Sequence, residues 1–296
     1  MGRSEVTVGI ALGAGGPLGW AFHLGVLDGI RHALGVEPAD AQRVIGTSAG
    51  GAIAASLLSG ADTETVLASI ATPMSEADQA EMRAAMAGGR RGWRRFLRPL
   101  APRTAIRRLP SAPITAAVGL LPGGVFPTFP LRRFPVADHA SWPDSLWLPS
   151  VRMDTGELVV FGRDRTDVDI RDALEATSAV PGMFRPKRID GVAHVDGAVA
   201  SATHADLLAD DGHDIVVISS VMTRPGRGPV KIRARHQLRQ EVATLERAGT
   251  RVIVIEPSTE VIELAKGWPR TGGERGPEIV AAAAKQTIDR LASRSV

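Results

Sequence analysis

A serine between two glycines stands where a strand is expected to end and a helix to begin. The segment Gly46-Thr47-Ser48-Ala49-Gly50 has the pattern G-x-S-x-G. In this pattern the glycines leave room for a tight turn that exposes the serine hydroxyl. The free N–H groups at a helix start stabilise negative charge that develops during a reaction. The pattern indicates a chemically active Ser48, with a plain helix-start turn as the alternative.

A glycine-rich loop follows the first apolar stretch of the chain and reads Gly13-Ala14-Gly15-Gly16-Pro17-Leu18-Gly19. A dinucleotide fingerprint would need a glycine where Leu18 stands, and a P-loop would need Gly-Lys-Ser/Thr, so nucleotide binding is a minor alternative. The loop offers exposed backbone N–H groups, which an oxyanion hole requires. A simple strand-to-helix connection is the other interpretation.

Two later segments carry further candidates. The residues Val195-Asp196-Gly197-Ala198 close a short expected hairpin. Since Asp-Gly is also a common hairpin turn, a structural role for Asp196 is the alternative. The stretch 179–186, which contains Pro181, is a rigid helix exit suited either to line a pocket or simply to end a helix.

The elements expected around these segments open as a parallel α/β sheet. The right-handed crossover rule puts both turns, 13–19 and 46–50, at the carboxyl edge, where such folds bind ligands. Strands are predicted over 5–12, 43–47, 147–153, 158–162, 214–221 and 251–256, a hairpin over 188–195, and helices over 17–34, 49–58, 62–87, 169–178, 230–248 and 277–293.

The 296-residue chain has a net charge of +3 and contains no Cys and no Tyr. The lack of cysteine excludes disulfides, thiolate zinc sites and a cysteine nucleophile, and it favours a reducing compartment. The basic residues are concentrated, because residues 83–137 contain eleven Arg and no Asp or Glu, which leaves a remainder of −8. A nucleic-acid-binding domain spreads its basic face through the fold, so we expect no nucleic-acid partner.

Residues 83–137 are expected to form a cap or excursion within a single domain of residues 1–296. Trp and Phe interleave with Arg there, which suits contact with an anionic membrane. A solvated Arg-rich helix paired with the acidic remainder is the alternative. Neither a signal peptide nor a run of about 18 apolar residues occurs, so we expect a cytoplasmic protein that binds membranes only peripherally.

Taken together, the segments 13–19, 46–50, 179–186 and 196–198 resemble the patatin-like phospholipase family, in the right order over roughly residues 5–222. The resemblance implies an α/β fold in three layers, with a mainly parallel central sheet flanked by helices on both faces. It also implies a serine acyl hydrolase of lipid esters, such as a phospholipase A or lysophospholipase, without a cofactor. The residues it implies are Ser48 as nucleophile, Asp196 as its base, backbone donors at Gly15 and Gly16 with Gly13 nearby, and motif support from Gly19, Gly46, Gly50, Pro181 and Gly197.

The sequence differs from the family pattern in two segments. Leu18 stands where the loop usually carries an Arg, and Ser201-Ala202-Thr203-His204 replaces the usual Asn-x-Pro after the Asp-Gly turn. Both changes affect residues that support the site and not the Ser-Asp pair itself. A weakly active protein that binds lipid or membrane as a regulatory module is therefore the alternative function.

A Ser-Asp-His triad would need a histidine after Asp196, and the candidates are His204, His213 and His236. His213 starts an expected strand and His236 lies in an Arg-rich helix, so we expect solvated or structural roles. His194 lies two residues before Asp196 on the same strand face, where it is placed to modulate it. No metal-binding pattern such as H-E-x-x-H occurs, so we predict no metal site.

Overall fold

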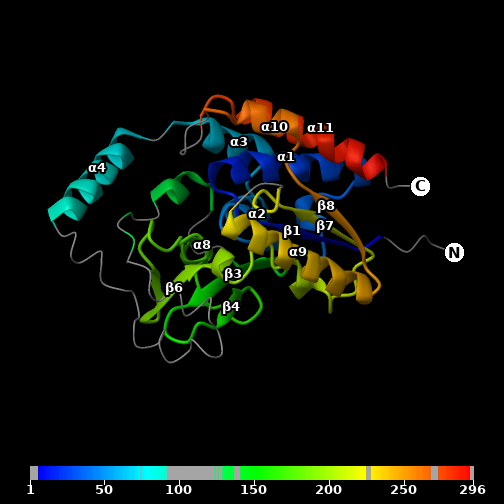
Figure 1. Ribbon diagram of the computed structural model, residues 1–296, viewed down its shortest axis with the longest axis horizontal. Coiled ribbons are helices and arrows are strands. Elements are labelled where there is room, and N and C mark those ends of the chain that lie inside the picture. Colours follow the sequence, from blue (N-terminus) through cyan, green and yellow to red (C-terminus); the bar gives the residue numbers. More distant parts are fainter. Residues whose placement is uncertain are drawn as a thin grey trace.

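The computed structural model describes residues 6–73, 75–91, 124, 126, 129–136, 141–224, 228–267 and 273–293. In these residues a mixed sheet of eight strands runs in the order β5-β6-β3-β2-β1-β7-β8, with β4 paired to β3 (Figure 1). Strands β3, β2, β1, β7 and β8 are parallel neighbours, whereas β4, β5 and β6 are antiparallel. The strands are β1 (Val8–Leu12), β2 (Arg43–Gly46), β3 (Leu146–Arg152), β4 (Leu158–Phe161), β5 (Lys187–Ile189), β6 (Val192–Asp196), β7 (Ile215–Ser219) and β8 (Arg251–Ile255).

The helices follow the sequence pattern with two differences. The helix predicted over 62–87 is two helices, because α3 ends at Ala71 just before Pro73, and the residue before a proline disfavours helical backbone. The short helix α10 lies in a stretch where none was predicted. The helices are α1 (Gly16–Leu34), α2 (Ala49–Leu58), α3 (Thr63–Ala71), α4 (Glu76–Arg91), α8 (Ile170–Thr177), α9 (Pro229–Arg247), α10 (Thr259–Leu264) and α11 (Gly276–Ala292).

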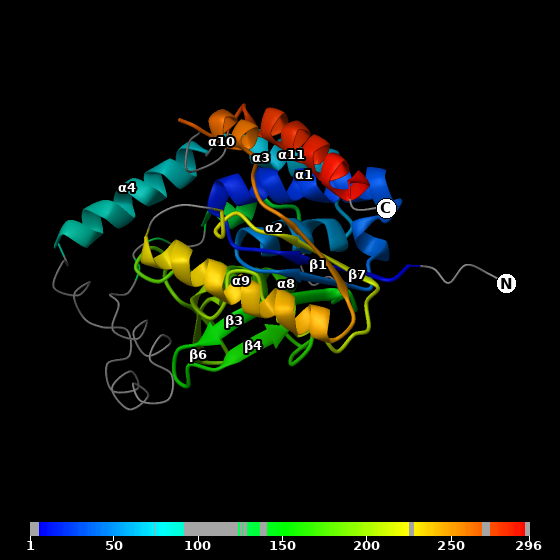
Figure 2. The ribbon, with the colours of Figure 1, turned by 45° about the vertical axis from the view of Figure 1, so that its right-hand side comes forward.

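Alternating strand residues build a core on each face of the sheet. Along β1, Ile10 and Leu12 join the larger core, while Ala11 joins the smaller one. Helices α1, α2, α3, α8 and α11 contribute to the larger core, and α9 covers the other face with Leu238 and Leu245. Figure 2 shows α9 and the α1–α11 pair on opposite sides of β1 and β7. The expected three-layer arrangement, with a mainly parallel sheet between helices, is confirmed.

The Arg-rich stretch 83–137 lies mostly outside the described residues. Its first part belongs to α4, which extends away from the sheet (Figure 1, Figure 2). At its other end, Leu131, Phe134 and Val136 are buried, and the Phe134 ring packs edge-on against Trp20 with a centroid distance of 5.1 Å. Leu131, Phe134 and Val136 therefore form part of the core, and the expected cap over 83–137 stays a prediction for the rest of the stretch.

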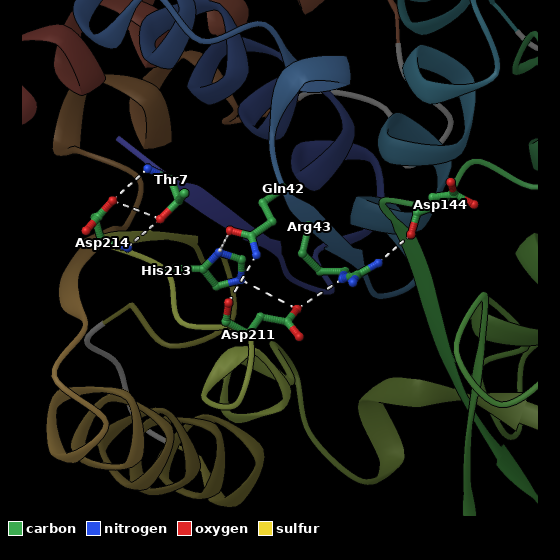
Figure 3. A network of polar contacts seen from close by, with 7 residues as sticks. All are labelled: Thr7, Gln42, Arg43, Asp144, Asp211, His213 and Asp214. Carbon is green, nitrogen blue, oxygen red and sulfur yellow. Dashed lines mark hydrogen bonds and ion pairs between the residues drawn. The ribbon is translucent and has the colours of Figure 1, made fainter. Parts of the chain in front are cut away.

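A polar network joins the loops at the amino ends of the strands (Figure 3). Arg43 Nε donates to the Asp211 carboxylate at 3.0 Å, and Gln42 Nε2 donates to the Asp211 carbonyl at 3.0 Å. The buried ring of His213 lies between them, with Nδ1 3.1 Å from Gln42 Oε1. His213 thus lies at the edge of the sheet opposite Ser48, which follows the carboxyl end of β2. This location agrees with the structural role expected for His213.

Candidate active site

Ser48 occupies the turn between β2 and α2. Its backbone has φ +53° and ψ −113°, a conformation that a residue with a Cβ adopts only under constraint. The Ser48 N–H donates to Thr177 Oγ1 at 3.3 Å, and the Thr177 hydroxyl donates to the Pro149 carbonyl. Helix α8 and strand β3 thus hold the turn in place. A strained strand-to-helix turn of this kind presents a serine hydroxyl to a pocket.

The glycines on either side of Ser48 are required by the close approach of backbone. A Cβ on Gly50 would lie 2.1 Å from the Leu12 carbonyl oxygen, and a Cβ on Gly46 would lie 2.6 Å from the Gly51 Cα. Both distances are far below van der Waals contact. Helix α2 can begin directly against the end of β1 only because these positions lack side chains.

Asp196 reaches Ser48 through an antiparallel strand. Strand β2 pairs with the start of β3, where Ile45 is opposite Trp147. Strand β6 pairs with the following residues of β3, where Asp196 is opposite Ser150. Strands β2 and β6 therefore end at successive positions along β3, although they are almost 150 residues apart in the chain. This register brings the last residue of β6 next to the turn that holds Ser48.

The Asp196 carboxylate is buried and hydrogen-bonded. Its side chain accepts the Ala198 N–H at 2.8 Å, and the Ser48 hydroxyl lies close enough to favour its charged form. Only 2% of Asp196 is exposed. Burial raises the pKa of the Asp196 carboxyl from 3.8 to about 7, while the Ala198 N–H and the Ser48 hydroxyl oppose this rise. A carboxylate with a pKa near neutrality can both take and return a proton.

The glycine-rich loop contributes backbone groups beside Ser48. The Gly13 N–H donates to the Ser219 carbonyl at 2.9 Å, so it is engaged and we remove Gly13 from the expected donors. Among the described residues, the N–H groups of Gly15 and Gly16 have no hydrogen-bond acceptor. They stand at the start of α1, where Gly16 has φ +57°. Free N–H groups at a helix start suit a developing negative charge.

A histidine that the sequence interpretation did not single out fixes this loop. The ring of His23 is fully buried, with Nε2 2.7 Å from the Gly13 carbonyl oxygen and Nδ1 2.7 Å from Ser219 Oγ. Burial lowers the pKa of His23 to about 4, so the ring is neutral at physiological pH. A neutral ring that donates from Nε2 to Gly13 accepts the Ser219 hydroxyl proton at Nδ1. Its position on the buried side of α1, one turn beyond the loop, was the available signal.

Three other described histidines, His194, His204 and His236, have surroundings of their own. His204 is buried with Nε2 3.0 Å from the Gly197 carbonyl oxygen, and His194 packs against the Phe161 ring at 5.4 Å. His236 is exposed on α9. No histidine lines the cavity at Ser48, and within the described residues none hydrogen bonds to Asp196. In the described part of the chain, the site therefore offers a Ser-Asp pair without a histidine bonded to it.

A buried glutamate supports the segment after Asp196. Glu241 of α9 accepts hydrogen bonds from the hydroxyls of Ser201 and Thr203. Between these two residues, the Ala202 carbonyl accepts the Ala14 N–H at 2.8 Å. The contacts run from α9 through residues 201–203 to the glycine-rich loop. The sequence analysis did not identify Glu241, because a single acidic residue in a charged helix carries no local signal.

An apolar cavity of about 720 Å³ opens beside Ser48 and Asp196. The expected helix exit contributes Pro181 to its wall, and the glycine-rich loop contributes Leu18. Most of the wall comes from three regions of the chain: the glycine-rich loop and α1, the 178–184 stretch, and the β7–α9 connection with the start of α9. Its lining includes Gly15, Gly16, Leu18, Trp20, Ser48, Leu131, Val180, Pro181, Met183, Phe184, Asp196, Val221, Met222, Arg224, Val230, Lys231, Arg233 and Ile262.

In the described part of the chain, no three His, Asp or Glu side chains are grouped so that they could hold a metal ion. No described helix is long and apolar enough to cross a membrane.

Comparisons with known proteins match a family model and solved structures. The family model of patatin-like phospholipases matches residues 10–209, which is more than half of the chain. Two solved structures are similar over nearly all of it. VipD from Legionella pneumophila has a TM-score of 0.45 at 12% identity, over 98% of this chain and 67% of that chain. The type III effector protein ExoU has a TM-score of 0.42 at 16% identity, and this chain covers 54% of its length.

Proposed function

The chain belongs to the patatin-like phospholipase family, and from this premise we propose that it hydrolyses acyl esters of lipids with Ser48 and Asp196 as a catalytic dyad. The observation that carries the proposal is the contact between these two side chains. Ser48, in a strained turn, lies beside a buried carboxylate whose pKa is raised to about 7. A nucleophile next to a base of matched pKa is what acyl transfer needs.

In the first half of the reaction, Asp196 takes the hydroxyl proton of Ser48 while Oγ attacks the carbonyl carbon of the ester. The carbonyl oxygen becomes an oxyanion, to which the N–H groups of Gly15 and Gly16 donate. The intermediate then collapses and expels the alcohol, which receives the proton held by Asp196. The product of this half is an acyl group on Ser48.

In the second half, water attacks the acyl carbon and Asp196 takes a proton from that water. The second tetrahedral intermediate expels Ser48 Oγ, which recovers its proton from Asp196, and the carboxylic acid leaves. The apolar cavity beside the dyad is suited to hold the acyl chain during both halves. No metal or cofactor is needed in this scheme.

A fluorophosphonate probe tests the proposal directly, because it phosphonylates only an activated serine. Wild type should form one adduct, located at Ser48 by peptide mass mapping, and should hydrolyse p-nitrophenyl butyrate. Ser48→Ala should lose both. Ser178→Ala should still form the adduct, since Ser178 is the other serine that lines the cavity. An adduct at Ser178, or hydrolysis that survives in Ser48→Ala, would remove Ser48 from the mechanism.

The alternative function, a lipid-binding module with little activity, predicts a different result from the same experiment. It predicts that wild type binds lipid but forms no adduct and hydrolyses no ester. Catalysis is favoured because His23 holds the glycine-rich loop in place, although Leu18 replaces the Arg of the family pattern. For this reason we place the hydrolase first.

A further inference from the structure

The cavity beside Ser48 is cationic where the β7–α9 connection reaches it. Arg224, Lys231 and Arg233 line it there, and we call these three residues the α9 basic cluster. Asp196 is the single acidic residue among the described residues that line the cavity, and its carboxylate is engaged by Ala198 and Ser48. The cavity therefore carries an excess of positive charge that no acidic side chain in its wall balances.

Arg233 is the member of this cluster that is tied to the turn after Asp196. Its Nη2 donates to the carbonyl oxygens of Val199 and Ala200, both at 3.1 Å, in the turn that follows Asp196. In the described residues it forms no ion pair, and burial lowers the pKa of its guanidinium. Partly burying a cation without a counter-charge is unfavourable unless another group compensates. An anionic ligand group in the cavity would supply that compensation.

Exposed apolar side chains occur in the wall of the same cavity and along the start of α9. Val230 of α9 is 62% exposed and Met183 is 44% exposed, and both line the cavity. Ile232, between Lys231 and Arg233, is also exposed. Exposed apolar surface that is bordered by polar residues is typical of a ligand-binding site. The combination of an apolar cavity with cations at one place fits an amphiphile that has an acyl chain and an anionic head.

We propose that the α9 basic cluster binds the anionic head group, with a phosphate as its central charge, of the lipid whose acyl ester is cleaved. The proposal rests on the function proposed above and names a substrate class for it. Arginine donates to phosphate through two parallel hydrogen bonds, and each charge-assisted contact is stronger than a neutral one. A choline head would place its quaternary ammonium near three cations, so the cluster should favour net-anionic lipids over zwitterionic ones.

Two monomeric lysophospholipids with the same acyl chain, lysophosphatidylglycerol and lysophosphatidylcholine, test this preference. The measured quantity is the ratio of their kcat/KM values, which is insensitive to a general loss of folded enzyme. We expect wild type to favour the anionic lipid about tenfold, and Arg233→Gln to lose most of this preference. Arg233→Lys should keep part of it. Arg239→Gln is the matched control, because Arg239 is an exposed arginine of the same helix that does not line the cavity.

A ratio near one in wild type, or a ratio that Arg233→Gln leaves unchanged, would overturn the proposal. Inhibition by inorganic phosphate separates a lipid head group from a free phosphate ligand. Millimolar phosphate should inhibit weakly, whereas micromolar inhibition without a lipid preference would assign the cluster to soluble phosphate. If wild type hydrolyses neither lipid, this result refutes the proposed Ser48-Asp196 dyad but not the proposed head-group site. Calorimetric binding of the two lipids to Ser48→Ala then still decides whether the cluster selects the anionic head.

Discussion

Replacing Asp196 by Asn should abolish hydrolysis and at the same time stabilise the fold at neutral and alkaline pH. The side chain is 2% exposed, and burial disfavours its charged form. An asparagine has nearly the same shape, and its Oδ1 can accept the Ala198 N–H that the carboxylate accepts now. The variant therefore loses the base while it removes a buried charge that destabilises the native state.

The size of this effect follows from the raised pKa of Asp196. The carboxyl has a pKa of about 7 in the folded chain against 3.8 for its ordinary value. Because the folded state binds the proton more tightly, this group stabilises the fold at low pH, and the contribution is lost as the pH rises from about 4 to 7. At about 1.4 kcal/mol per pKa unit the full loss is about 4 kcal/mol, of which about 2.5 kcal/mol falls between pH 5 and pH 8.

Urea unfolding of wild type and Asp196→Asn at several pH values between 5 and 8 measures this loss. The variant should gain stability relative to wild type by about 2.5 kcal/mol across this range, since other titrating groups cancel in the difference. Asp62→Asn is a control of opposite sign. Asp62 accepts the N–H and hydroxyl of Thr65, which lower the pKa of its carboxyl, so this variant should be less stable than wild type at neutral pH.

A stability difference between Asp196→Asn and wild type that does not change with pH would refute this reasoning. It would mean that the Asp196 carboxyl titrates at its ordinary value in the folded chain. A base of such low pKa would be a weak acceptor for the Ser48 proton. The proposed dyad would then lose its main physical support, even if the variant were inactive.

Three further measurements bear on the site and on the Arg-rich stretch. The kcat/KM of wild type should rise with pH around about 7, because Asp196 must be deprotonated to accept the Ser48 proton; a flat profile from pH 5 to 9 would contradict this. Glu241→Ala should lower the free energy of unfolding by roughly 2–4 kcal/mol and kcat by about tenfold, since it leaves buried hydroxyls without an acceptor; Gln240→Ala, at an exposed neighbouring position, is the control. Binding to anionic vesicles should exceed binding to neutral ones and weaken with salt. It should fall when Gln replaces the four arginines Arg90, Arg91, Arg94 and Arg95, and equal losses on vesicles and on a short soluble ester would instead indicate a role of the stretch in the fold.

The sequence predicted the parallel part of the fold and the turn of Ser48 between β2 and α2 well, because both depend on local patterns, whereas the role of Asp196 came from the family resemblance. Apolar runs that end in glycine define β1 and β2, and the turns after them must meet at one edge of the sheet. The glycines at 46 and 50 are likewise local, since each is dictated by backbone contact within the turn. The break between α3 and α4 at Pro73 carried a local signal that was missed.

What the sequence could not give are the contacts made between distant segments. His23 meets Ser219 across almost 200 residues, and Glu241 meets Ser201 across 40. Neither contact leaves a periodic pattern, because one polar side chain on a buried helix face looks the same whether or not it has a partner. The hydrogen bond from the Gly13 N–H to the Ser219 carbonyl is also a contact between distant segments, so the sequence alone does not reveal it.

The contacts of His23 give a physical reason why the glycine-rich loop can carry Leu18 where the family pattern has an Arg. An Arg there would anchor the glycine-rich loop with a cation, but Leu18 packs toward the core and the cavity instead. The anchor comes from His23, which holds the Gly13 carbonyl from the buried side. Because burial lowers the pKa of His23 to about 4, this anchor stays neutral across the range in which Asp196 titrates, so the pH–rate profile reports on Asp196. The loop side of the cavity is then apolar, and its positive charge comes from α9 and the connection before it, where we place the head group.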